Sequence, residues 1–274
     1  MCLILLAWRA HPAFPLVLAA NRDEAYDRPS AAAAFWPDAP QVYGGRDLDK
    51  GGTWLGVSTA GRIAVVTNFR DGRSSPRPDA RSRGELTAGF LRGSEDPRDY
   101  LARIASRASE YNGFTLIVGD RERLWWYSNR GHGIGEIAPG VHALSNHLLD
   151  TPWPKVRQSR ARLAAMLEEN EDRLVAELSE LLADRSPAPD EELPDTGVGL
   201  VRERELSCIF IAGERYGTRA STVLLVSRRN EALCVERRFG PRGAPLGETI
   251  RRFPLEPAAP AATKREPGRS AVNR

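Results

Sequence analysis

The sequence has few cysteines, and their arrangement argues against two familiar kinds of site. Only three occur among 274 residues, Cys2, Cys208 and Cys234, and no two of them form a CxxC pair. An odd and sparse set of this kind argues against a disulfide framework and against a cysteine-held zinc site. The four histidines include no HExxH or HxxxH pair, so the sequence gives no support to a histidine-held metal either.

Long hydrophobic runs are also missing. No stretch approaches the ~18 apolar residues that a membrane-spanning helix needs. The apolar segment 2–7 has no basic residues before it, and it lacks the length and cleavage site of a signal peptide. We therefore expect a cytoplasmic protein with reduced thiols and no integral membrane association.

The sequence also lacks a strong net charge of either sign, and it lacks glycine-rich nucleotide-binding motifs. The formal net charge is +3, and the polar segment 254–274 supplies +2 of it through four basic and two acidic residues. The main part of the chain is therefore nearly neutral, and no nucleic-acid-binding motif accompanies its basic pI, so we expect no nucleic-acid partner. No GxGxxG or GxxxxGK[ST] motif opens a helix after a strand, so dinucleotide and P-loop sites have no support.

The chain is long enough for one large domain with a buried core. Short apolar runs predict strands at 2–8, 14–20, 52–58, 62–68, 114–118, 124–128, 141–145, 208–211, 222–227 and 233–238. Helical spacing is found at 82–91, 97–108 and 156–183, and polar or proline-containing segments predict loops at 25–40, 70–81 and 187–199. Strands grouped apart from paired helices favour the α+β class, with one domain at 1–253 and a disordered tail at 254–274.

Cys2 is the first candidate for chemistry, because it directly follows the initiator methionine. A methionine before so small a residue is normally removed, which would leave Cys2 with both a thiol and a free α-amine. An α-amine has an unperturbed pKa of about 7.7–8.0 and a thiol about 8.5, so the amine can accept the thiol proton near neutral pH. Taken alone, Cys2 is better explained as a small buried hydrophobe at a strand start.

Polar side chains at the ends of other predicted strands raise the weight of the catalytic interpretation. The run Asn21-Arg22-Asp23-Glu24 follows the second strand, Asn68 ends a third and Asn146 ends a fourth. Asparagine side chains can stabilise a developing oxyanion, a buried aspartate can hold an amine, and an arginine can favour a thiolate. We therefore take Cys2, Asn21, Arg22, Asp23, Asn68 and Asn146 as the candidate catalytic residues.

Eight ordered motifs within residues 1–240 resemble the NRDE family, also called the transport and Golgi organisation protein 2 family. They are Met1-Cys2, Asn21-Arg22-Asp23-Glu24, Gly51-Gly52-Thr53-Trp54-Leu55-Gly56, Thr67-Asn68-Phe69-Arg70, Ser82-Arg83-Gly84, Tyr111-Asn112-Gly113-Phe114, Leu144-Ser145-Asn146 and Tyr216-Gly217-Thr218-Arg219. The resemblance implies a four-layer αββα sandwich of two antiparallel sheets, the fold of N-terminal-nucleophile hydrolases.

The family is more distantly similar to choloylglycine hydrolases and penicillin V acylases, and that similarity implies residue roles. Cys2 matches the nucleophile, Asp23 the residue that binds its amine, and Asn68 and Asn146 the two asparagines. The arginine departs from the pattern. Those hydrolases carry it three residues before the aspartate, where this chain has Ala20, whereas Arg22 is adjacent to Asp23 and is expected to face the other side of the strand.

The leading hypothesis is an N-terminal cysteine amidohydrolase that cleaves the carbon–nitrogen bond of a small acylated substrate and needs no cofactor. The resemblance also implies a rival, a non-enzymatic haem or lipid and acyl-CoA trafficking protein on the same fold, with haem as a bound ligand. The small-molecule partner is accordingly an amide, an acyl compound or a haem-like ligand.

Three further residues are candidates for substrate binding. Arg70 opens a basic loop beside Asn68 and could meet an anionic group, although a solvated loop is the simpler interpretation. Arg219 could bind an anion or form a structural ion pair. His147 follows Asn146 and could act as an acid or a haem ligand, or lie at the surface.

Overall fold

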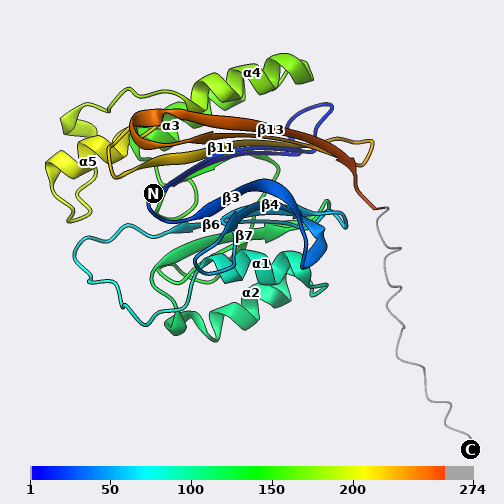
Figure 1. Cartoon of the computed structure of the whole chain (residues 1–274), viewed down its shortest axis with the longest axis horizontal. Helices are drawn as coiled ribbons and strands as arrows, with labels where there is room; N and C mark the ends of the chain where they lie inside the picture. The colour runs from blue at the N-terminus through cyan, green and yellow to red at the C-terminus, as the bar shows by residue number, and fades with distance from the viewer. Residues whose placement is uncertain (1, 257–274) are drawn as a thin grey trace, which may run out of the picture.

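The computed structural model describes residues 2–256 and shows two β-sheets stacked face to face, with helices on both outer faces (Figure 1). Helices α3 (Pro154–Ala165), α4 (Glu171–Leu182) and α5 (Leu200–Ser207) lie on one side, and α1 (Gly84–Arg92) and α2 (Pro97–Ala105) on the other. The predicted αββα sandwich is therefore confirmed. No helix within residues 2–256 is both long and apolar enough to cross a bilayer.

Cys2 begins a strand that lies next to an edge strand of the first sheet. In spatial order the strands are β10 (Gly140–Leu144), β1 (Cys2–Trp8), β2 (Leu16–Ala25), β11 (Tyr216–Val226), β12 (Glu231–Phe239) and β13 (Pro245–Pro254). Adjacent strands run antiparallel, so Cys2 lies directly opposite Arg22 and Arg22 opposite Ala220. Strand β1 has paired neighbours on both sides, β2 from Cys2 onward and β10 from Ile4 onward.

The second sheet follows chain order and lies below the first. Its strands are β3 (Ser30–Trp36), β4 (Ala39–Asp47), β5 (Leu55–Ser58), β6 (Ile63–Asn68), β7 (Phe114–Gly119), β8 (Leu124–Ser128) and β9 (Ile134–Glu136). All of these pairs are antiparallel. Asn68 is the last residue of β6 and lines the same pocket as Cys2.

Strand β1 is buried on both faces, which explains its unbroken apolar sequence. Its even-numbered side chains, such as Ile4 and Leu6, belong to the core between the two sheets. The odd-numbered side chains Leu3 and Leu5 pack in a second core against α3 and α4. A third core joins α1 and α2 to the second sheet. Alternation along β1 and β2 therefore decides which polar side chain faces which layer.

Several predicted elements are wrong in detail. Segment 25–40 holds β3 and the start of β4 rather than a loop; its prolines stand beside β3, in the turn, or in β4. Segment 208–211 is not a strand, and α5 precedes it. Strand β2 continues through the Asn21–Glu24 run, because β1 and β11 pair with it on both sides.

The predicted tail also begins too early. Strand β13 runs to Pro254, Leu255 is buried, and the amides of Leu255 and Glu256 donate to Asn230 and Thr59. The rest of the predicted tail, 257–274, lies outside the described residues.

Two glycines from separate motifs allow α1 to approach the second sheet closely. A side-chain carbon added to Gly52 would lie 2.5 Å from the carbonyl oxygen of Gly84 and 2.9 Å from the amide of Glu85. Thr53 also donates its amide to the Gly84 carbonyl at 3.1 Å. This contact fixes the start of α1, and with it the segment Ser82–Gly84 that lines the pocket described below.

We expect Gly52→Ala to destabilise the protein by roughly 2 kcal/mol, because the added methyl group overlaps backbone atoms that cannot rotate away. The measurement is the free energy of unfolding in urea. Gly240→Ala is the matched control, since its nearest contact would be an ordinary 3.6 Å from the Leu246 side chain. Equal stability of the two variants would contradict the close approach.

Candidate active site

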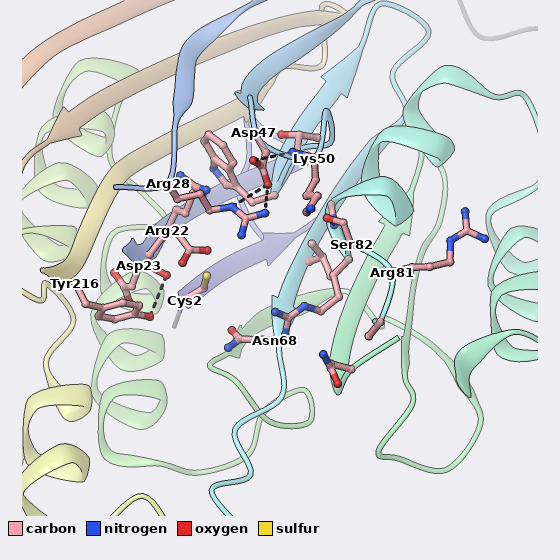
Figure 2. Close-up of a pocket in the computed structure, with 18 of the residues that line it drawn as sticks. Cys2, Arg22, Asp23, Arg28, Asp47, Lys50, Asn68, Arg81, Ser82 and Tyr216 are labelled. Atoms are coloured by element: carbon pink, nitrogen blue, oxygen red, sulfur yellow. Dashed lines mark hydrogen bonds and ion pairs between the residues drawn. The ribbon is translucent and has the colours of Figure 1, made fainter. Parts of the chain in front are cut away.

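Cys2 lies in a pocket of about 320 Å³ formed between the ends of the two sheets. Figure 2 shows its sulfur between Asp23 on one side and Asn68 on the other, with Arg22 above it. The Cys2 side chain is partly exposed, so a small molecule in the pocket can reach it. The size suits a small-molecule ligand.

Asn146 joins Cys2 to the opposite sheet. Its side-chain oxygen accepts a hydrogen bond from the Cys2 backbone nitrogen at 3.0 Å. Its side-chain nitrogen donates to the Thr67 hydroxyl at 2.8 Å, and to the carbonyl and side-chain oxygens of Asn68 at 2.9 and 2.7 Å. Asn146 is fully buried. Its amide is therefore committed at both ends and acts as a bridge, whereas Asn68 lines the pocket with its own amide nitrogen turned away from Asn146.

The segment that carries Asn146 is held in an unusual conformation. Asn146 and Asp150 both have positive φ, 54° and 57°. Asparagine and aspartate tolerate this region better than most residues. The Asp150 carboxylate accepts from the Ala143 amide at 2.8 Å and contacts the His142 ring at 2.7 Å. The Asn146 carbonyl accepts from the Arg70 amide at 2.7 Å, which ties the same segment to the second sheet.

Arg22 faces the space between the sheets, on the same face as Cys2. The two residues are direct cross-strand partners, and the Arg22 guanidinium lies 4.2 Å above the ring centre of Trp54. As expected for adjacent residues of a strand, Asp23 belongs to the other face. Both nevertheless line the pocket, because it opens at the strand ends.

Asp23 is buried on the helix side of the first sheet, where it meets polar partners. The Thr218 hydroxyl donates to its carboxylate at 2.7 Å, and the Tyr216 hydroxyl to its carbonyl at 3.0 Å. Burial raises the pKa of Asp23, while the nearby positive charge of Lys155 and the Thr218 bond act in the opposite direction. Lys155 is itself buried, which lowers its pKa to about 8, and it donates to the Cys208 carbonyl at 3.1 Å.

Asn21 lies on the helix side of β2 and away from the pocket. Its side-chain nitrogen donates to the carbonyls of Leu182 and Ile209, both at 2.8 Å, and its oxygen accepts from the Ser221 hydroxyl at 2.6 Å. These bonds occupy both ends of the amide. The structure thus places Asn21 as a link between the sheet and the helical layer.

The three candidate substrate-binding residues do not line the pocket. Arg70 forms a buried ion pair with Glu203 at 2.6 Å. Arg219 donates to the backbone carbonyls of Ala25 and Arg28, at 2.7 and 2.9 Å. The ring of His147 packs against Phe69 and Trp153, and its Nδ1 contacts the Thr151 hydroxyl. Each side chain is committed to contacts that organise loops around the site.

Two charged residues beside the site receive no individual role from the sequence. Arg83 lines the pocket and donates to the Gly113 carbonyl at 3.2 Å. The sequence places it in the Ser82-Arg83-Gly84 motif and in the basic loop that Arg70 opens, which could meet an anionic group or simply be solvated. Lys155 gave only a weak signal, a single lysine among apolar residues at the start of a helix.

Comparison with known proteins places the chain in a family. Residues 1–241 match the family described as Transport and Golgi organisation 2. The chain belongs to the transport and Golgi organisation 2 family. Its Bos taurus homolog is 37% identical over 257 residues, covering 86% of this chain and 92% of that protein. The Drosophila melanogaster protein of the family is 28% identical over 262 residues, covering 86% and 91%.

Among solved structures, this chain is similar at low sequence identity to two hydrolases. The C2A mutant of conjugated bile acid hydrolase from Clostridium perfringens is 9% identical, with a TM-score of 0.48 over 93% of this chain and 92% of that chain. The Caenorhabditis elegans ortholog of N-acylethanolamine-hydrolyzing acid amidase is 10% identical, with a TM-score of 0.46 over 82% and 92%. Function does not carry over at this level of likeness.

The pair of His142 and Asp150 makes the stability of the Asn146 segment depend on pH. The hydrogen bond to Asp150 raises the pKa of His142, and His142 in turn helps to hold the pKa of Asp150 down against burial. Because the pKa of His142 is raised in the folded state, His142 stabilises the fold fully at pH values below the unfolded pKa of about 6.5. This stabilisation is lost as pH rises through the higher folded pKa. The pKa of Asp150 is lowered in the folded state, so its contribution to stability is lost as pH falls below about 4.

We therefore expect His142→Gln to cost roughly 1–2 kcal/mol of stability near pH 5.5 and clearly less near pH 8.5. Urea unfolding of the wild type and the variant at both pH values measures the difference. A cost that is the same at both pH values would exclude a charged His142–Asp150 pair.

Proposed function

We propose that this protein is an N-terminal cysteine hydrolase that cleaves the carbon–nitrogen bond of a small amide. One observation carries the proposal: the Cys2 thiol faces a pocket while the Cys2 nitrogen is bonded to Asn146, whose other end holds Asn68. When Met1 is removed, that nitrogen becomes the α-amine. Nucleophile, base and oxyanion donor then lie around one small space.

The first half of the reaction forms an acyl-enzyme. The thiol proton moves to the Cys2 α-amine, and the sulfur attacks the amide carbonyl carbon of the substrate. Negative charge develops on the carbonyl oxygen, where the Asn68 amide nitrogen can donate a hydrogen bond. The protonated α-amine gives its proton to the leaving nitrogen, the carbon–nitrogen bond breaks, and a Cys2 thioester and a free amine remain.

The second half uses one water molecule. The α-amine takes a proton from water, the resulting hydroxide attacks the thioester, and the carbon–sulfur bond breaks to release a carboxylic acid. Asn146 has the role of a positioning residue throughout, because its oxygen accepts from the Cys2 nitrogen and aims the amine. Arg22 places a positive charge directly across the strand pair from the thiolate.

Removal of Met1 and reactivity of Cys2 form the first test. We expect the intact mass of the purified protein to lack one methionine. We also expect Cys2→Ala to lower hydrolysis by roughly 10³-fold or more, because the nucleophile is gone. The assay is release of aminocoumarin from a set of N-acyl amides with short, medium and long acyl chains. A retained Met1, or no turnover of any amide by the mature protein, would sink the proposal.

The two pocket asparagines provide a matched pair of variants. Asn68→Ala should lower kcat by roughly 10²-fold while KM changes little, because the hydrogen bond forms mainly in the transition state. Asn112→Ala is the control. Asn112 lines the same pocket, but its oxygen accepts from the Arg77 amide and its nitrogen donates to the Arg77 carbonyl. Equal kcat values for the two variants would remove Asn68 from the mechanism.

The rival proposal, haem trafficking with His147 as a haem ligand, agrees poorly with the residues that line the pocket. His147 packs against Phe69 and Trp153 instead of facing the pocket, so it is not placed to ligate an iron there. Titration with haemin discriminates the two proposals. Saturable binding with a Soret shift that Cys2→Ala abolishes would favour the carrier function over hydrolysis.

A further inference from the structure

We infer that the pocket contains an anion subsite formed by Arg22 and Arg83, and that the substrate is an amide carrying a carboxylate or similar small oxyanion close to the scissile bond. The statement that the bound anion belongs to a substrate rests on the proposed function. The subsite itself rests only on the charges and contacts around Cys2.

Arg22 is the first support, because it is buried without a partner for its charge. Only 6% of the residue is exposed. Within residues 2–256, one of its terminal nitrogens is shielded from solvent and has no hydrogen-bond partner. Its guanidinium packs on the face of Trp54, which supports a cation but does not satisfy its N–H groups. A buried guanidinium normally meets a carboxylate or phosphate. Because Arg22 also lines the pocket, an anion bound there could balance its charge through the part of the guanidinium that faces the pocket.

Arg83 supplies a second charge from the segment directly before α1. It donates one N–H to the Gly113 carbonyl, and no carboxylate of residues 2–256 lies within ion-pair distance of it. Burial lowers the pKa of both Arg22 and Arg83, while Cys2 and Glu24 oppose that effect at both residues. Both guanidinium groups therefore interact electrostatically with the Cys2 thiol. An anion between them would lie next to the reacting sulfur.

The start of α1 adds to the positive charge that Arg22 and Arg83 bring to the pocket. Ser82, Arg83 and Gly84 line the pocket and lead into a nine-residue helix. The first turn of a helix carries a partial positive charge that favours anions. The close contact of Gly52 with Gly84 holds this helix start against the pocket.

The acidic groups of the pocket do not cancel these charges. Asp47 is paired with Arg28 at 2.6 Å. Asp23 lies on the helix side of β2, where Thr218 and Lys155 act on it. Glu24 is the one carboxylate that influences both Arg22 and Arg83, and it also accepts from the Ala25 amide at 3.0 Å. Two cations against one carboxylate leave an excess positive charge for a ligand.

The test compares two alkylating reagents that differ in charge. Iodoacetate is an anion, and iodoacetamide is its neutral counterpart. Their rates at Cys2 are followed by mass spectrometry of the Cys2 peptide, and the ratio of rates is divided by the ratio for free mercaptoethanol. A change in thiolate content alters both rates equally, so the ratio reports anion binding alone. Neither reagent needs Met1 removal or hydrolysis, so the subsite and the proposed function can fail separately.

We expect wild-type Cys2 to favour iodoacetate by about tenfold relative to mercaptoethanol, the effect of one well-placed charge interaction. Arg22→Gln and Arg83→Gln should each lower this preference, and Glu24→Gln should raise it. Arg81→Gln is the control, because Arg81 also lines the pocket but pairs with Glu85 and Glu110. It should leave the ratio unchanged.

Three results would overturn the subsite. The first is a Cys2 ratio equal to that of mercaptoethanol. The second is a preference that survives both Arg83→Gln and Arg22→Gln. The third is a preference that Arg81→Gln lowers as much as they do. If Arg22→Gln does not fold, Arg83→Gln and Glu24→Gln still decide the matter, because their side chains are more exposed.

Discussion

The side-chain amide of Asn146 is the interaction on which the site depends. Asn146 lies two residues after β10 of the first sheet. Its side chain accepts from Cys2 in the neighbouring strand and donates to Thr67 and Asn68 in the second sheet. A fully buried amide with every bond made is costly to disturb, so it fixes the distance between the two sheets at the pocket. The thiol of Cys2 and the amide of Asn68 keep their relation to one another through this one side chain.

Charge is arranged in two layers around that bridge. On the helix side of the first sheet, Asp23, Lys155 and the pair of Arg70 and Glu203 are buried, and each has polar or oppositely charged neighbours. Between the sheets, Arg22 is buried without a carboxylate partner of its own. Unpaired buried charge costs stability, so its place beside the thiol is better explained by a ligand than by folding.

The sequence predicted the layers of the fold and the residues at strand ends better than it predicted side-chain partners. Cys2 and Asn68 stand at the ends of the apolar strands β1 and β6, whose pattern is plain, and Asn146 follows β10 by two residues. Alternation could have assigned Asn21 to the helix side, since it shares parity with the residues that face α4. The strands within 25–40 were missed because alanine and proline dilute their pattern. Arg83 could not be told apart from the other arginines of its basic loop, because its place in the pocket is set by the docking of α1.

The central claim is that a free Cys2 amine is the base that activates the Cys2 thiol. It is tested most directly by extending the chain with a short segment that a protease removes immediately before Cys2, and by following amide hydrolysis during that cleavage. The account predicts no hydrolysis before cleavage and a rate that rises in proportion to the fraction of protein with a free Cys2 amine. The same hydrolysis rate before and after cleavage would contradict it.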